Sequence, residues 1–503
     1  MNITKHTVIA LSLLTGAVTG CGGDEAQQLS DATHADVTSE EGDSAAAEAG
    51  SLDTSPGDSS QPEDTQAPDV ESLESRRSFC GQPEYNWLPT DAMGQIMDRD
   101  PRPFYSLSKD LVTALLADSG FSDILDLKYD VEVIAIRYTS QDRGVATDAT
   151  ALLGVPIAPE GETLSTPIIA FLAGTSGFSE ACAGSNSEGN ALAAILYASQ
   201  GYVAMLPDYL GKAGFGGDDG LAHPYVVSEA AAIATWDGVR GAEALLAERG
   251  EEVQSDGRVF LWGGSQGGHA AYAADRLAPH YAPEFEVVGT IATVAPSDLM
   301  GQAEVAVDSL GPAAVGLLAS CITLAEWYGM WDRVDEIVRD DDEMPLASWL
   351  REQMKTVCFP DLSVLGVETT EDAFNPLFLA ALQDGSWAGY EDWQCVFKEN
   401  SLSHQSVPRL NATPTLTVLA TEDSLVNLAV ERKSHQALCE QGYALTQIEC
   451  DQANHTDGTS WSVREQFAWM RERLKGEPHT ETCAPVTPVC CSGSPAETCT
   501  PAP

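Results

Sequence analysis

Short apolar runs, many of them β-branched, alternate with segments of helical periodicity between residues 127 and 455 of this chain. This alternation predicts a largely parallel sheet covered by helices, so the expected fold class is α/β. We expect strands at 127–138, 145–157, 166–173, 201–207, 258–263, 286–295, 413–421 and 445–451, the first two as an antiparallel pair. We expect helices at 187–200, 226–248, 266–277, 425–441 and 462–475.

Residues 297–408 interrupt this rhythm, because they contain helical patterns but no clear strand. A long helical insertion between two strands predicts a cap or lid, and a few of its apolar side chains are expected to line a binding tunnel. Its apolar stretch at 310–331 is broken by Gly311, Pro312 and Gly316, which argues against a membrane span. Helices are expected here at 313–331, 332–339, 347–356 and 373–382.

The first 21 residues have the pattern of a secretory signal peptide. Lys5 and His6 precede an apolar run at 8–17, and small residues then lead to Cys21. This ending resembles a bacterial lipobox, in which the cysteine is acylated, so Cys21 is the candidate lipid attachment site. The alternative is an ordinary signal peptide cut nearby. We therefore expect an exported protein, anchored to a bacterial membrane by its N-terminal lipid or otherwise secreted.

Residues 22–78 are rich in Ser, Asp, Glu, Ala, Thr, Gly and Pro, which predicts a disordered acidic tether. Fifteen acidic residues at 24–74 against two arginines leave the tether at about −13 of the formal net charge of −50, and the folded body at about −37. Such a charge repels nucleic acid and anionic membrane surfaces. The expected α/β core comprises 79–296 and 409–478, followed by a Cys-, Pro- and Thr-rich tail at 479–503.

The strongest chemical signal is the sequence Gly-Gly-Ser-Gln-Gly around Ser265. An apolar run precedes it and a helix of small residues follows it, as in a nucleophile elbow. Glycines two positions before and after the serine are needed because neighbouring backbones approach closely there. The turn places the hydroxyl at a helix N-terminus, where free N–H groups can stabilise an oxyanion. Ser265 is therefore the candidate nucleophile.

A serine nucleophile needs a histidine to take its proton and a carboxylate to orient that histidine. Asp423 follows the strand predicted at 413–421, and Glu422, which would point to the other face if the strand alternation persists, is its competitor. His455 lies in a polar loop after the last predicted strand and is the candidate base, whereas His223 and His269 are treated as decoys. One oxyanion donor should be the backbone N–H of Gln266, and Thr175 in the glycine-rich loop 173–177 is the candidate for the second.

With these residues in place, the chain resembles the secretory lipase family of α/β-hydrolases, the lipase A-like group with a helical cap. The resemblance covers about 127–475. Its motifs are Gly174-Thr175, Cys182-Ala183-Gly184-Ser185, Gly201-Tyr202-Val203, Pro207-Asp208-Tyr209-Leu210-Gly211, His223-Pro224-Tyr225, Asp237-Gly238-Val239-Arg240-Gly241-Ala242 and Gly264-Ser265-Gln266-Gly267-Gly268. Many relatives carry a histidine before the Gly-Thr pair, where this chain has Ala173. We expect Asp208 and Tyr209 to brace the loops around the cleft rather than to react.

The resemblance implies a lipase or esterase acting on small-molecule or lipid esters, with no cofactor and no metal. It also implies a disulfide from Cys182 to a cap cysteine, with Cys321 the candidate, and Cys439–Cys450 as a second pair. Twelve cysteines in an exported chain favour disulfides, and at least one thiol stays free if Cys21 is acylated. The alternatives are a serine peptidase of the prolyl-oligopeptidase type and an inactive surface binding protein with the same fold. Sequence does not indicate the oligomeric state.

Overall fold

The computed structural model describes residues 80, 85–117, 122–216, 220–250, 252–479, 483–495 and 499. The expected signal peptide, Cys21 and the acidic tether lie outside these residues, as does the end of the tail. The strands are β1 (Ile96–Pro101), β2 (Asp130–Asp142), β3 (Val145–Ile157), β4 (Leu164–Leu172), β5 (Val203–Pro207), β6 (Val253–Gly264), β7 (Glu286–Thr293), β8 (Thr415–Ala420) and β9 (Leu445–Cys450).

The strands of the described residues form one sheet in the order β1-β2-β3-β5-β4-β6-β7-β8-β9. The pairs β1/β2, β2/β3 and β3/β5 are antiparallel, and the strands from β5 through β4, β6, β7 and β8 to β9 are parallel. The predicted α/β class is therefore confirmed, with the expected antiparallel opening at β2 and β3. β5 and β8 are buried along their whole length, as expected for parallel strands covered on both faces.

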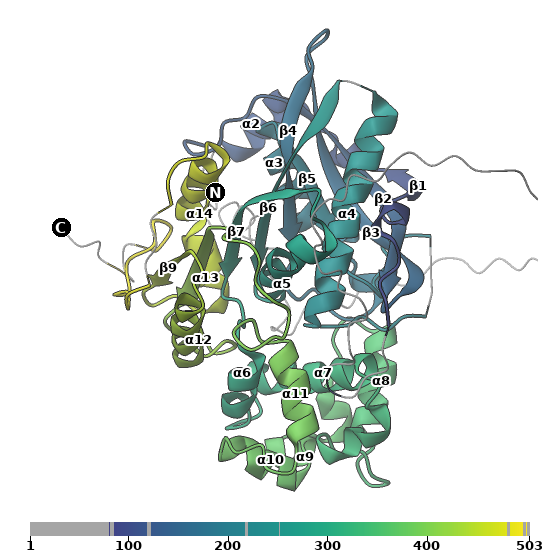
Figure 1. Ribbon diagram of the computed structural model, residues 1–503, viewed down its shortest axis with the longest axis vertical. Helices are drawn as coiled ribbons and strands as arrows, with labels where there is room; N and C mark the ends of the chain where they lie inside the picture. The colour runs from purple at the N-terminus through teal and green to yellow at the C-terminus, as the bar shows by residue number, and fades with distance from the viewer. Residues whose placement is uncertain are drawn as a thin grey trace, which may run out of the picture. The chain divides into compact units, whose positions relative to one another are not determined.

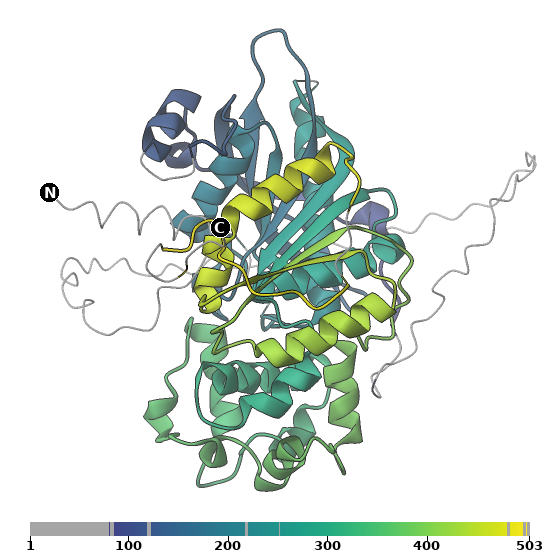
Figure 2. The ribbon, with the colours of Figure 1, turned by 90° about the vertical axis from the view of Figure 1, so that its left-hand side faces the viewer.

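Helices cover both faces of this sheet (Figures 1 and 2). One hydrophobic cluster joins the sheet to α4 (Ser228–Arg249) and α5 (Gln266–Tyr281), and a second joins its other face to α3 (Glu188–Ser199) and α14 (Val463–Leu474). Small residues let α4 approach closely, since a methyl group at Gly238 would lie 2.9 Å from the sulfur of Met205 in β5. The remaining helices outside the β7–β8 interval are α2 (Lys109–Leu116), α12 (Leu428–Glu440) and α13 (His455–Trp461).

Between β7 and β8 the chain forms helices without a strand of the sheet, at one end of the sheet (Figure 1). They are α6 (Leu299–Ala306), α7 (Pro312–Trp327), α8 (Leu346–Thr356), α9 (Thr370–Ala373), α10 (Pro376–Gln383) and α11 (Glu391–Glu399). The helix expected at 313–331 ends at Trp327, because Gly329 has a φ of 67° that cannot continue an α-helix, and the helix expected at 332–339 is a 3-10 helix, Trp331–Glu336. No helix among the described residues is long and apolar enough to cross a bilayer.

The expected disulfide pairs are wrong, although the expected cysteines Cys182, Cys439 and Cys450 are all bonded. The disulfides are Cys80–Cys395, Cys182–Cys358, Cys439–Cys483, Cys450–Cys491 and Cys490–Cys499. Cys321 is a free thiol buried inside α7. Cys182 does reach the β7–β8 interval, but at Cys358, whose carbonyl accepts a hydrogen bond from Phe178 N at 3.1 Å.

Cys439 and Cys450 cannot pair because β9 separates them. Cys439 lies in the last turn of α12, close to where β9 begins, and Cys450 is the last residue of the strand. Six residues of extended chain span roughly 20 Å, whereas a disulfide needs Cα atoms within about 7 Å. Each of these cysteines instead pairs with a residue of the C-terminal tail.

Candidate active site

Ser265 stands on a sharp turn between β6 and α5, the arrangement expected for a nucleophile elbow. Its backbone has φ of 56° and ψ of −121°, a conformation that costs roughly 1–3 kcal/mol in a non-glycine residue. Two glycines make the turn possible, since a methyl group at Gly263 would overlap the Gly267 carbonyl and one at Gly267 would overlap the Leu172 carbonyl. The N–H of Ser265 donates to the Thr293 carbonyl at 2.8 Å, which fixes the turn to β7.

The structure brings His455 into hydrogen-bonding contact with Ser265, 190 residues away in the sequence. His455 Nε2 lies 2.9 Å from Ser265 Oγ, and its Nδ1 lies 2.8 Å from Asp423 Oδ2. His455 does not lie in a loop, as predicted, but is the first residue of α13. Asn454 caps this short helix by accepting from the N–H groups of Thr456 and Asp457, both at 3.0 Å.

Both carboxylate oxygens of Asp423 accept hydrogen bonds. Oδ1 accepts the backbone N–H groups of Leu425 at 2.8 Å and Val426 at 2.9 Å, while Oδ2 faces His455. A carboxylate that accepts from Nδ1 leaves the lone pair on Nε2, directed at Ser265 Oγ. The Asp423 side chain is only 2% exposed, whereas Glu422 is exposed and its N–H binds the Ala453 carbonyl. The geometry therefore distinguishes Asp423 from its competitor.

The two residues chosen for the oxyanion hole belong to segments that adjoin Ser265. Gln266 is the first residue of α5, so its N–H is one of the amides without a partner inside the helix. The loop after β4 lies against the elbow, since a methyl group at Gly174 would lie 3.8 Å from Ser265 Cβ. The adjacent Thr175 has its hydroxyl 3.0 Å from the hydroxyl of Tyr225.

His223 is not a second base, but it orients Gln266, a role that the sequence did not indicate. His223 Nδ1 lies 3.0 Å from the Leu210 carbonyl, which can only accept, so the proton sits on Nδ1. Its Nε2 therefore accepts from the Gln266 side-chain amide at 2.9 Å. Burial lowers the pKa of His223 well below its ordinary value and keeps it neutral. His269 is also buried, with its pKa lowered to about 4, and binds the Asn400 carbonyl.

Two residues just after β5, Asp208 and Tyr209, brace the segment that follows β4, as expected. The Tyr209 hydroxyl donates to the Ala173 carbonyl at 2.8 Å. The buried carboxylate of Asp208 accepts from Ser185 N and Thr150 Oγ1, both at 2.6 Å. The sequence did not single out Lys212, because a lysine in a glycine-rich segment is expected to be exposed to solvent.

Lys212 is 1% exposed and donates to Ser176 Oγ at 2.8 Å and to the Gly177 carbonyl at 3.3 Å. Burial lowers the pKa of Lys212 to about 8, while the nearby Asp208 favours the charged form. Through these two contacts the ammonium group fixes the end of the loop that carries Thr175. Lys212 is therefore a candidate positioning residue for the site.

An apolar cavity of about 80 Å³ opens beside Ser265 and Gln266 toward the helices between β7 and β8. Small and apolar residues of α6 and α7 form much of its wall, and a few polar side chains such as Gln302 and Ser320 interrupt it. The wall residues from these two helices include Leu299, Ala303, Ala306, Ala313, Gly316 and Leu317. A methyl group at Gly316 would meet nothing within 4 Å, so this glycine leaves open space in the cavity.

Comparisons with known proteins agree with this fold. A segment of 91 residues is 42% identical to Lipase A of Arthroderma benhamiae, over 18% of this chain and 17% of that protein. A segment of 290 residues is 23% identical to Lipase 6 of Candida albicans, over 56% of this chain and 58% of the relative. The chain thus matches less than two thirds of the length of either relative.

Two solved structures have the same α/β-hydrolase fold. The rice cell wall degrading esterase LipA of Xanthomonas oryzae superposes with a TM-score of 0.59 at 20% identity, over 77% of this chain and 100% of that one. Lipase A of Candida antarctica in its closed state gives a TM-score of 0.59 at 16% identity, over 82% and 90%. The sequence model of the family described as secretory lipase matches residues 185–482, more than half of the chain. This chain therefore belongs to the secretory lipase family.

Proposed function

We propose that this protein is an exported serine hydrolase that cleaves carboxylic esters through an acyl-enzyme intermediate. The observation that carries the proposal is the hydrogen-bonded chain from Ser265 Oγ through His455 to Asp423. Membership of the secretory lipase family supports ester hydrolysis, and the disulfides fit an oxidising compartment outside the cytoplasm.

In this mechanism Ser265 Oγ attacks the ester carbonyl while His455 Nε2 takes its proton. Asp423 keeps Nε2 unprotonated before the attack and stabilises the imidazolium that forms. The backbone N–H of Gln266 and a donor at Thr175 stabilise the oxyanion of the tetrahedral intermediate. His455 then gives its proton to the departing alcohol, and a water molecule repeats the sequence on the acyl-enzyme to release the acid.

We assign 79–296 and 409–478 to the hydrolase core and 297–408 to a cap. The apolar cavity between Ser265 and helices α6 and α7 would receive the acyl group of a small-molecule or lipid ester. Attachment of lipid at Cys21 would hold the enzyme at a bacterial membrane. Incorporation of an alkynyl fatty acid that is lost in Cys21→Ala would support this anchor, and equal incorporation in the variant would refute it.

The function is tested by assaying purified protein on p-nitrophenyl esters of increasing chain length beside dipeptide nitroanilides. We expect ester cleavage that falls by at least 10⁴-fold in Ser265→Ala, about the loss seen when a triad member is removed. Faster cleavage of the anilides would favour the peptidase alternative. No hydrolysis by the folded parent protein would favour an inactive binding protein.

A further inference from the structure

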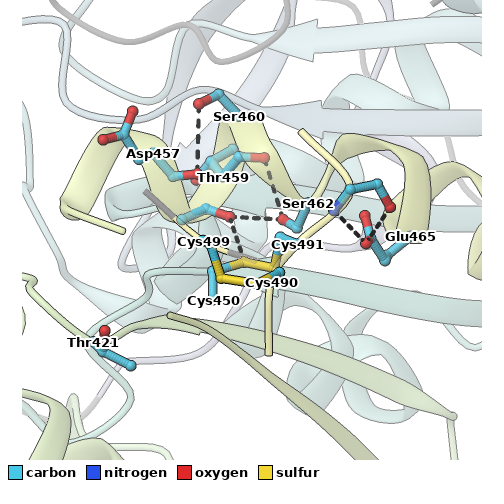
Figure 3. Close-up of a disulfide and its surroundings, with 12 residues drawn as sticks. Thr421, Cys450, Asp457, Thr459, Ser460, Ser462, Glu465, Cys490, Cys491 and Cys499 are labelled. Atoms are coloured by element: carbon cyan, nitrogen blue, oxygen red, sulfur yellow. Dashed lines mark hydrogen bonds between the residues drawn. A yellow bond between two sulfur atoms is a disulfide. The ribbon is translucent and has the colours of Figure 1, made fainter. Parts of the chain in front are cut away.

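All but the first few residues of the C-terminal tail, 479–503, lie beyond the match to the secretory lipase family, which ends at residue 482. Two disulfides tie its described residues to the body of the protein, Cys439–Cys483 and Cys450–Cys491, and a third, Cys490–Cys499, joins two tail residues to each other. Cys450 is fully buried and Cys491 is 2% exposed. The tail is therefore anchored in the core at Cys491, and Figure 3 shows Cys490, Cys491 and Cys499 near Thr459 and Ser460 of α13.

Cys450 is the point where the acid-bearing and base-bearing segments meet. Its carbonyl accepts from Thr421 N at 3.1 Å, two residues before Asp423, and from Ala453 N at 3.4 Å, two residues before His455. Its sulfur lies 3.8 Å from the Gly458 carbonyl in α13. The bond to Cys491 thus fixes the tail at the junction that sets the Asp423–His455 distance.

The tail also makes backbone contacts along the outer side of this junction. Val489 N donates to the Glu449 carbonyl at 2.8 Å and Asp451 N donates to the Val489 carbonyl at 2.9 Å, so the tail extends the edge of β9. Gly493 N donates to the Trp461 carbonyl at 2.8 Å, at the last residue of α13. A methyl group at Gly493 would lie 2.8 Å from the Trp461 Cα, so this approach requires glycine.

α13 also rests on the sheet at the elbow. Thr459 Oγ1 lies 2.7 Å from Thr293 Oγ1, and the Thr293 carbonyl holds Ser265 N. Gly458 packs against Ala420 of β8, where a methyl group would lie 2.8 Å from the Ala420 Cβ. A helix of seven residues has little stability of its own, so its position depends on packing from both sides.

We propose that the Cys450–Cys491 disulfide and the Gly493–Trp461 contact are a positioning device for His455. By closing the outer side of α13, they hold the imidazole at hydrogen-bonding distance from Ser265 Oγ. The inference rests on the proposed catalytic role of His455. It assigns to the tail a function in the reaction, in addition to any contribution to stability.

The test compares the double variant Cys450→Ala/Cys491→Ala with Cys490→Ala/Cys499→Ala in the full-length protein. The second pair is the matched control, because it removes the disulfide that joins only tail residues. We would measure kcat and KM on p-nitrophenyl butyrate and the rate of fluorophosphonate labelling, at least 15 °C below the midpoint of thermal unfolding of each variant. A merely structural role predicts unchanged kcat per folded molecule.

We expect the first variant to lose at least tenfold in kcat and in labelling rate, with KM within twofold, and the control to stay within twofold of the parent. Gly493→Ala tests the same contact without changing any disulfide, and it should lower kcat by about tenfold. If the Cys450/Cys491 variant does not fold, Gly493→Ala decides alone.

Parental kcat in either folded variant, or an equal loss in the control, would overturn the inference. Neither result would touch the proposed function, which fails instead if the parent protein does not cleave esters or if Ser265→Ala still does. The two proposals therefore fail through different variants.

Discussion

Replacing Asp423 by asparagine should leave the fold intact but prevent His455 from acting as the base toward Ser265. Oδ1 of Asp423 accepts two backbone N–H groups, from Leu425 and Val426, so the amide oxygen of the asparagine would take that place. Its NH₂ group would then face His455 Nδ1, where the carboxylate oxygen now lies at 2.8 Å. Because NH₂ can only donate, the imidazole proton would move to Nε2 and point at Ser265 Oγ.

The wrong tautomer costs about 10⁴ in kcat in a serine protease with the same triad, which corresponds to about 5.4 kcal/mol of transition-state stabilisation. We expect a loss of this size for Asp423→Asn on p-nitrophenyl butyrate, with the midpoint of thermal unfolding within a few degrees of the parent. Glu422→Gln is the matched control, since its side chain is exposed, and should stay within twofold. An Asp423→Asn protein with more than a tenth of the parental kcat, or an inactive Glu422→Gln protein, would refute the reasoning.

Three further predictions concern the cavity, the loop 173–177 and a buried carboxyl group. Gly316→Leu should fill the open space beside Ser265 and so raise the ratio of kcat/KM for butyrate esters to kcat/KM for octanoate esters about tenfold. The control Gly316→Ala should change this ratio little. An unchanged ratio in Gly316→Leu would argue against an acyl site there. Lys212→Met should lower kcat about tenfold with little change in KM, because Ser176 Oγ and the Gly177 carbonyl lose their hydrogen-bond donor. A parental kcat would show that Lys212 does not position the loop. Burial raises the pKa of Glu431 from 4.5 to about 7, so between these pH values the folded state binds more protons than the unfolded state. The free energy of unfolding should therefore fall as pH rises through this window, by on the order of 3 kcal/mol. Glu431→Gln should lose this dependence in denaturant titrations at pH 5 and pH 8; identical pH dependence in both proteins would contradict the assignment.

The hydrophobic pattern predicted the central strands well because burial on both faces selects apolar and β-branched residues, as in β5 and β8. It missed β1 because this edge strand, Ile96–Pro101, is exposed along most of its length and is largely polar. It also missed α13, whose residues are mostly poor helix formers. That helix depends on the local Asn454 cap and, beyond it, on tertiary packing against the sheet and the tail, which the pattern does not reveal.

The candidate site was predictable to the extent that it depends on chain order. A serine at a strand-to-helix turn, an acid after a later strand and a histidine after the last strand can be placed from local sequence. The roles of His223 and Lys212 could not be predicted from local sequence, because each depends on contacts between separate segments of the chain. The disulfide pairing could not be predicted either, since Cys439 and Cys450 form disulfides with cysteines of a tail that carries no secondary-structure pattern.

The central claim is that Ser265 is a nucleophile activated by His455 and Asp423. The most direct measurement is to label the parent protein with a fluorophosphonate probe and locate the adduct by peptide mass spectrometry. The account predicts one adduct, on Ser265, that is absent from Ser265→Ala and forms at least 10³-fold more slowly in His455→Ala. An adduct on another residue, or labelling of Ser265→Ala at the parental rate, would contradict it.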